Sequence, residues 1–221
     1  MKTVRITYFS DVLCVWAYIA QLRVDAVNAA FGDKVAFEPR FCSVFGDTRR
    51  KIAAKWGGYD HFTAHLLQSA EAFPEVRLSP DIWRTARPAS SLGPHLFLKG
   101  AQLAEAAGRW PSGQADAVSR AMREAFFERA EDIGAWDVQR GVARDADADP
   151  AAVDDLIRSG EAFAALAADY EAADALRIHG SPSFVLNDGR QKLYGNVGYR
   201  IIEANIQELL RAPNPDNASW C

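Results

Sequence analysis

The order of strand-like and helix-like patterns constrains the fold of this chain more than any other feature. Residues 4–9 are rich in β-branched and aromatic side chains and predict a strand, and residues 16–31 carry apolar side chains at helical spacing. Residues 35–41 predict a second strand, which Pro39 either weakens or places near a sheet edge. The chain therefore opens with a strand–helix–strand unit, whose parallel strands need a right-handed crossover.

A long helical region follows this unit. Residues 45–178 are almost wholly helical in pattern, with Pro and Gly residues between the segments. The clearest Ala-rich amphipathic segments are residues 96–107, 114–130 and 161–176. Such a region between two groups of strands predicts an insertion that folds as a helical lobe.

The strand pattern returns near the end of the chain. Residues 183–186 and 191–194 predict two strands, and the Asn-Asp-Gly-Arg turn at 187–190 joins them into a hairpin. Residues 199–210 then predict a closing amphipathic helix. The second sheet-forming part of the chain is thus a strand–strand–helix unit.

Composition excludes several classes of protein. Hydrophobic residues make up 49% and charged residues 24% of the chain, as in an ordinary globular protein. The net charge of −4 gives no electrostatic footprint for nucleic acid or an anionic membrane. No apolar run approaches the ~20 residues of a membrane span, and no signal-peptide pattern precedes the first strand. We therefore expect a cytoplasmic protein with no nucleic-acid or membrane partner.

Cys14 is the residue with the strongest chemical signal. It lies between the first strand and the first helix, in the segment Asp-Val-Leu-Cys-Val-Trp-Ala-Tyr. A cysteine at the first turn of a helix meets unpaired N–H groups and the positive end of the helix dipole, which favour the nucleophilic thiolate. Ala17 occupies the position where a dithiol motif has its second cysteine. The alternative is a buried, inert cysteine.

The other two cysteines offer weaker signals. Three cysteines are too few for a disulfide scaffold. Cys42 ends the second strand, so it should lie at the same sheet edge as Cys14 and could act as a displaced resolving thiol. A buried core thiol, or a thiol too far from Cys14 for a disulfide, is the favoured interpretation. Cys221 ends the chain and could reach Cys14 or another chain, although an unpaired thiol without a role is favoured.

Two residues next to Cys14 are candidates for the same site. Asp11 either caps the following helix, which is favoured, or tunes Cys14, where as an anion it would oppose a thiolate. Trp16 either covers the sulfur and forms part of a substrate platform or packs in the core.

The histidines do not predict a metal centre. His61 and His65 are four residues apart, as helical metal ligands can be, but no third ligand is visible, so an exposed helix face is expected. His95 follows Gly-Pro at a helix start, and a surface position is slightly favoured over one lining a pocket.

Two segments resemble known families. The segment YFSDVLCVWAYIA resembles the active-site segment of DsbA-like thiol oxidoreductases of the FrnE-like cytoplasmic branch, where Asp-Val-x-Cys-Pro-Trp-Cys-Tyr is typical. It is also similar to kappa-class glutathione transferases and 2-hydroxychromene-2-carboxylate isomerases. HGSPSFVLNDGRQKLYGN resembles the Gly-x-Pro-x-Phe-Val segment of all three. The resemblance and the element order together indicate an α/β, thioredoxin-like fold, with residues 1–44 and 179–221 as one discontinuous domain and residues 45–178 as the helical insertion lobe.

The resemblance also implies roles for residues near the C-terminus. The proline that matches Pro182 is cis in these families, and the residue that matches Ser181 pairs its backbone with an extended thiol peptide. Asn196 could hold the γ-glutamyl end of glutathione, although the acidic residue usual in the glutathione-binding families is missing. Val15 and Ala17 replace the usual Pro and resolving Cys.

Three classes of function remain open. The first is a thiol-disulfide oxidoreductase with the single active-site cysteine Cys14, acting on a thiol or disulfide peptide or small molecule and requiring no cofactor beyond glutathione as a co-substrate. The second is a glutathione-dependent isomerase or transferase in which Cys14 stands where the relatives have Ser. The third is a redox-inactive binding module. Related proteins are often dimers, so a homodimer is an expectation as well.

Overall fold

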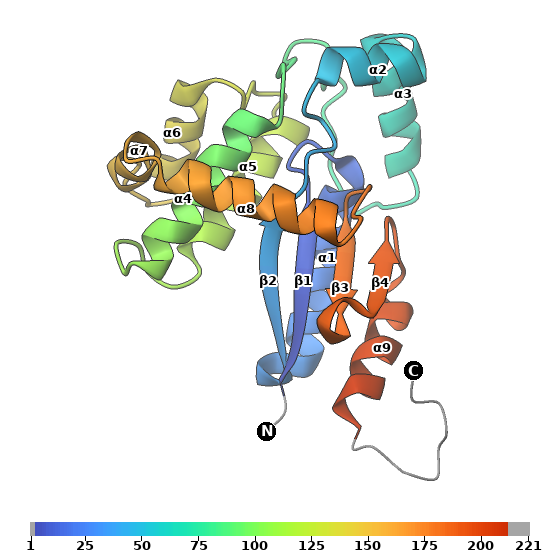
Figure 1. The fold of residues 1–221 in the computed structure, drawn as a ribbon. Coiled ribbons are helices and arrows are strands. Elements are labelled where there is room, and N and C mark those ends of the chain that lie inside the picture. The colour runs from blue at the N-terminus through green and yellow to red at the C-terminus, as the bar shows by residue number, and fades with distance from the viewer. Residues whose placement is uncertain (1–2, 212–221) are drawn as a thin grey trace.

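The computed structural model describes residues 3–211, in which a four-stranded mixed sheet is covered by helices (Figure 1). The strand order is β2-β1-β3-β4. β1 and β2 are parallel, whereas β3 is antiparallel to both β1 and β4. The strands are β1 (Val4–Ser10), β2 (Val35–Phe41), β3 (Ser183–Leu186) and β4 (Gln191–Tyr194). This is the sheet expected of the thioredoxin-like fold.

Helices fill the intervals that the sequence pattern assigned to them. Seven helices, α2 to α8, lie in the chain between β2 and β3, and α9 closes the described part of the structure. None of the helices within residues 3–211 combines the length and the apolar character that a membrane crossing requires. The helices are α1 (Val15–Phe31), α2 (Thr48–Trp56), α3 (Tyr59–Ala70), α4 (Leu92–Ala106), α5 (Gln114–Phe127), α6 (Trp136–Asp145), α7 (Ala151–Arg158), α8 (Glu161–Ala175) and α9 (Tyr199–Leu210).

The two faces of the sheet are covered by different helices, as Figure 1 shows. Alternate side chains of a strand point to opposite faces. Ile6 and Tyr8 of β1 therefore pack into a core with residues of α1 and α9, including Ile202. Phe9 points to the other face, where it packs with Ala173 of α8.

Helix α1 connects the sheet core to the helical region. From Ala20 onward, its buried residues pack against the sheet. Its first residues, including Val15 and Ile19, belong instead to the large core formed with α2 to α8. The start of α1, where Cys14 lies, is therefore held at the junction of the sheet and the helices. The domain division at residues 44 and 179 stays a prediction.

Two helix boundaries differ from the sequence pattern by more than one residue. α4 begins at Leu92 rather than residue 96, because Pro94 lies in the first turn, where the missing N–H costs no hydrogen bond. α5 ends at Phe127 rather than residue 130, and Ala130 has a positive φ of 51° that an α-helix cannot contain. Pro39 lies in β2, which is an edge strand as expected.

Candidate active site

Cys14 faces the loop that leads into β3. It is the N-cap residue of α1, with extended backbone (φ −87°, ψ 115°), and its side chain is buried, with the residue 6% exposed. Its own N–H donates to the Asp11 carbonyl at 3.0 Å. Its Sγ donates to the carbonyl oxygen of Ser181, 3.1 Å away and 167 residues later in the chain. The two segments singled out in the sequence therefore meet at this sulfur.

The Ser181–Pro182 peptide bond is cis, as predicted. The hydroxyl of Ser181 accepts a hydrogen bond from the Asp11 N–H at 2.8 Å. The Pro182 carbonyl accepts one from Gly195 N–H, also at 2.8 Å. These bonds fasten the loop on both sides, so its backbone is presented to Cys14 in a fixed position.

Asp11 holds the loops around Cys14 together. Its carboxylate is fully buried and accepts from the N–H groups of Leu13, Val44 and Phe45 and from the Ser91 hydroxyl, at 2.7–3.0 Å. A buried carboxylate is stable only when several donors replace its water. Leu13 precedes the helix, so the expectation that Asp11 caps α1 was wrong. Asp11 is fully buried, and its contact with a substrate stays a prediction.

His95 is part of the same buried network. It is fully buried, which corrects the expected surface position. Its Nε2 accepts from the Val12 N–H at 3.0 Å, so its Nδ1 carries the proton and donates to the Tyr170 hydroxyl at 2.9 Å. Burial lowers the pKa of His95 to about 4, with the Asp11 charge acting in the opposite direction. The imidazole is therefore a neutral group that positions the Cys14 loop.

The thiol of Cys14 is neutral in this closed site. Burial raises its pKa above the ordinary value, and the Asp11 carboxylate raises it further. Hydrogen bonds from the Ser181 side chain and from the backbone of Ala17 and Trp16 lower the pKa but do not outweigh burial. Burial therefore favours the alternative of a buried cysteine with a neutral thiol over the thiolate expected from the helix start.

Cys42 lies at the same sheet edge as Cys14. Its Sγ is 3.8 Å from the Gly180 carbonyl, the one before the carbonyl that Cys14 contacts. Both cysteines are free and buried. Burial, and then the Asp11 and Cys14 charges, raise the pKa of Cys42. A resolving role for Cys42 stays a prediction, and Cys221 lies outside the described residues.

The remaining candidates surround the site less closely. Trp16 is half-buried and packs edge-to-face on Phe73, with ring centroids 6.3 Å apart. Asn196 is exposed and follows Gly195, which bonds to the cis-proline carbonyl. No group of three or more His, Cys, Asp or Glu side chains in residues 3–211 is arranged to hold a metal ion.

Sequence reasoning missed the contacts that attach the helices to the site. The Ser91 hydroxyl donates to Asp11 Oδ2 at 2.8 Å. Asp169 of α8 accepts from the Phe41 N–H at 3.0 Å and pairs with Lys99 of α4 at 2.5 Å. An isolated Ser or Asp in a helical pattern carries no signal for a partner far away in the chain. Tertiary structure alone assigns these roles.

Comparisons with known proteins agree with this fold. The family model of the DSBA-like thioredoxin domain matches residues 5–207. No curated protein matches the sequence.

Several solved structures share the fold. A probable DsbA oxidoreductase from Streptomyces coelicolor is 21% identical, with a TM-score of 0.71 over 96% of this chain and 92% of that one. The cytosolic disulfide reductase DsbM from Pseudomonas aeruginosa is also 21% identical, with a TM-score of 0.68 over 93% and 99%. A 2-hydroxychromene-2-carboxylate isomerase is 16% identical, with a TM-score of 0.67 over 93% and 95%. At these identities the likeness shows the fold alone.

Proposed function

Because the chain belongs to the family of DSBA-like thioredoxin domains, we propose that it catalyses thiol-disulfide exchange through the single cysteine Cys14. The observation that carries this proposal is the 3.1 Å contact between Cys14 Sγ and the carbonyl of Ser181, the residue before the cis-proline. A substrate backbone that pairs with Ser181 would bring its own sulfur next to Cys14.

The substrate is a disulfide of an extended peptide or of glutathione. The Ser181 carbonyl is a buried acceptor whose partner is the Cys14 thiol, and a substrate N–H can take its place. Asn196, exposed on the turn after Gly195, would receive a polar end of the substrate. DsbM from P. aeruginosa has been solved with GSH, which supports glutathione as the co-substrate here. The reducing cytoplasm, the location of DsbM, is the proposed compartment.

Substrate binding also activates the thiol. Once a substrate N–H also donates to the Ser181 carbonyl, the hydrogen bond from the Cys14 S–H to that oxygen weakens, and the proton passes to water. The sulfur then faces the donors of Ser181, Ala17 and Trp16, all of which favour the thiolate. The thiol is therefore protected at rest and ionises when a substrate is present.

The exchange then proceeds in two steps, the formation of a mixed disulfide and its release. The Cys14 thiolate attacks one sulfur of the substrate disulfide, which forms a mixed disulfide on Cys14 and releases the other sulfur as a thiolate that takes up a proton. Ala17 carries no sulfur to break this bond. A glutathione thiolate attacks the bound substrate sulfur, forms a glutathione mixed disulfide and returns Cys14 as a thiolate.

One observation favours a second candidate, a glutathione-dependent isomerase or transferase. Burial keeps Cys14 neutral and its S–H already acts as a donor. The same S–H could donate to a bound glutathione thiolate without forming a covalent bond, as the serine of such enzymes is expected to do.

Turnover of a glutathionylated peptide by glutathione tests the proposal. We expect the wild type to accelerate release of the peptide thiol and Cys14→Ser to be inactive, with Cys42→Ser as the matched control that retains activity. Undiminished activity in Cys14→Ser would contradict exchange at Cys14. Reversible glutathione binding that survives Cys14→Ser, without turnover of disulfides, would favour the isomerase or transferase.

A further inference from the structure

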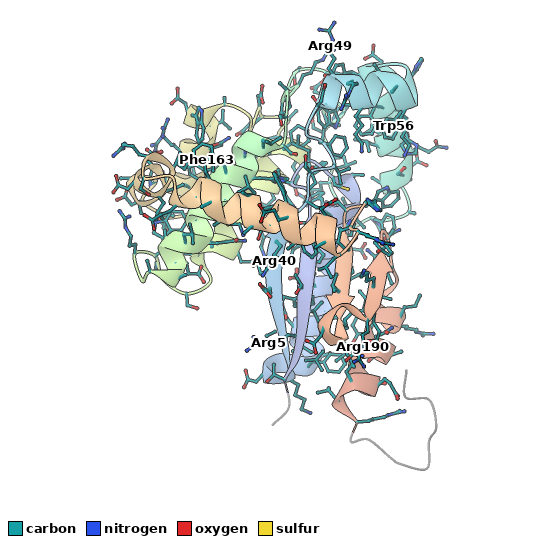
Figure 2. All side chains as sticks on the ribbon, in the orientation of Figure 1. Arg5, Arg40, Arg49, Trp56, Phe163 and Arg190 are labelled. Atoms are coloured by element: carbon teal, nitrogen blue, oxygen red, sulfur yellow. The ribbon has the colours of Figure 1, made fainter. Side chains whose placement is uncertain are left out.

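A cavity lies beside the edge strand β2 of the sheet. It has a volume of about 660 Å³ and is lined by strands β1 and β2 and by helices α1, α4, α5 and α8. Arg40 at its rim is labelled in Figure 2, on β2 close to α8. Cys14 is not among the lining residues. The volume is within the range of small-molecule sites, so the cavity is large enough for a ligand of its own.

Arg123 of α5 is a buried cation in the wall of this cavity. It is only 4% exposed. Its Nη1 donates to the Ser119 hydroxyl at 3.2 Å and its Nη2 to the Ser10 hydroxyl at 3.0 Å. Its Nε is buried without a hydrogen-bond partner in the described part of the chain. No carboxylate of residues 3–211 lies within 4.0 Å of the guanidinium.

The other charges around the cavity already have partners. The cationic side chains pair with carboxylates at 2.5–2.7 Å, namely Lys99 with Asp169, Arg40 with Glu38, and Arg120 with Asp25 and Asp116. The Glu105 carboxylate accepts from the N–H groups of Gly113 and Ala115 at the start of α5. Arg123 is thus the cation of the described lining whose charge is not balanced.

We infer that this cavity binds a small organic acid, whose carboxylate pairs with Arg123. A guanidinium offers a planar fork that fits a carboxylate, and a buried unpaired charge is stabilised by an opposite charge in the same low-dielectric site. Apolar walls formed by Tyr8, Val24, Phe37 and Leu103 would cover the rest of the molecule. The ligand is therefore an acid with an apolar body rather than inorganic phosphate.

The cavity adjoins the loop of Cys14 without including it. Ser10, which accepts from Arg123, directly precedes Asp11. Tyr8, in the cavity wall, donates its hydroxyl to the Ala17 carbonyl in the first turn of α1 at 3.4 Å. Binding of the acid does not use the thiol, so it should be the same in Cys14→Ala, which separates this inference from the proposed function.

Calorimetric titration of the full chain with octanoate and 2-naphthoate tests the inference, with 1-octanol and 2-naphthol as uncharged controls. We expect at least one carboxylate to bind about tenfold or more tightly than its alcohol, as for a charge-assisted hydrogen bond. Arg123→Gln should abolish this preference and Arg123→Lys should retain part of it. Arg129→Gln, whose side chain pairs with Glu131 at the surface outside the cavity, is the matched control and should bind like the wild type.

Thermal unfolding of each variant shows whether it is folded before titration. If Arg123→Gln does not fold, the comparison of Arg123→Lys with the wild type decides the question. Lys keeps the positive charge but lacks the planar guanidinium group. Equal binding of acid and alcohol, an unchanged preference in the folded Arg123 variants, or no binding of either acid at about 10 mM would overturn the inference.

Discussion

The Cys14 sulfur lies 3.1 Å from the Ser181 carbonyl oxygen and, as a thiol, donates to it. This contact joins the start of the first helix to the cis-proline loop that precedes β3. The acceptor that holds the proton is also the backbone group that a peptide substrate would pair with. In the proposed mechanism, the protonation state of the thiol and the occupancy of the substrate position are therefore linked.

The raised pKa of Cys14 predicts slow alkylation at neutral pH. The rate of reaction with iodoacetamide, measured with Cys42→Ala and Cys221→Ala in the background, should keep rising with pH beyond ~8.5, the value of a free thiol. A plateau below that pH would mean a standing thiolate and would contradict the closed, neutral thiol.

Asp11→Asn should make the protein less stable and the thiol more reactive. An amide cannot accept all four hydrogen bonds of the buried carboxylate, so the free energy of unfolding should fall by about 2–4 kcal/mol in urea titrations. Removal of the Asp11 charge also lowers the pKa of Cys14, so alkylation at a fixed pH should become faster.

Asp47→Asn is the matched control for this change. Asp47 caps α2 at the surface through the Arg50 N–H, and Asn is an equally good N-cap. Stability and alkylation should therefore stay close to the wild type. A similar loss of stability in both variants would contradict the claim that the buried carboxylate of Asp11 stabilises the fold.

His95 should make the protein sensitive to mild acid. Its folded pKa of about 4 lies below its ordinary value of 6.5, so between these values the unfolded chain binds more protons than the folded one. Stability is therefore lost as the pH falls from about 6.5 to 4, by up to about 3 kcal/mol. His95→Gln, whose side chain can still accept from Val12, should reduce this loss in urea unfolding at pH 7 and 4.5. An identical loss of stability between pH 7 and 4.5 in both proteins would contradict the assignment of this acid sensitivity to His95.

Cys42 should not be needed to release the mixed disulfide. Burial raises its pKa, so external glutathione is the faster nucleophile. Cys42→Ala should release a glutathione adduct from Cys14 at a rate within about twofold of the wild type. A Cys14–Cys42 disulfide in the oxidised wild type, found by peptide mapping, would instead assign Cys42 the resolving role.

Local pattern was sufficient to predict most of the fold. β2, β3, β4 and α9 have the predicted bounds. Turn-forming residues mark several of these ends, since β3 lies between Pro182 and Asn187, β4 ends before Gly195 and α9 begins after Gly198. The motifs also identified the two segments that meet in the site. The sequence could not reveal the buried network, because Asp11 meets Ser91, and Val12 meets His95, across 80 and 83 residues.

The protonation state of Cys14 could not be predicted from the sequence, for a related reason. The helix start that favours a thiolate is visible locally, whereas the burial that opposes it comes from the helices packed over the site. His95 shows the same limit. Its surroundings in the sequence fitted a surface helix equally well, and only the packing of α4 against the Cys14 loop placed it inside.

The central claim is that Cys14 forms a covalent bond with a substrate sulfur, and trapping of that bond tests it most directly. The protein would be incubated with glutathione disulfide, acid-quenched, and analysed by intact mass and peptide mapping, with Cys14→Ser treated in parallel. We expect one glutathione adduct on Cys14 that disappears when reduced glutathione is added before the quench. A wild type that binds glutathione but carries no adduct on Cys14 would contradict the exchange mechanism and leave Cys14 as a hydrogen-bond donor.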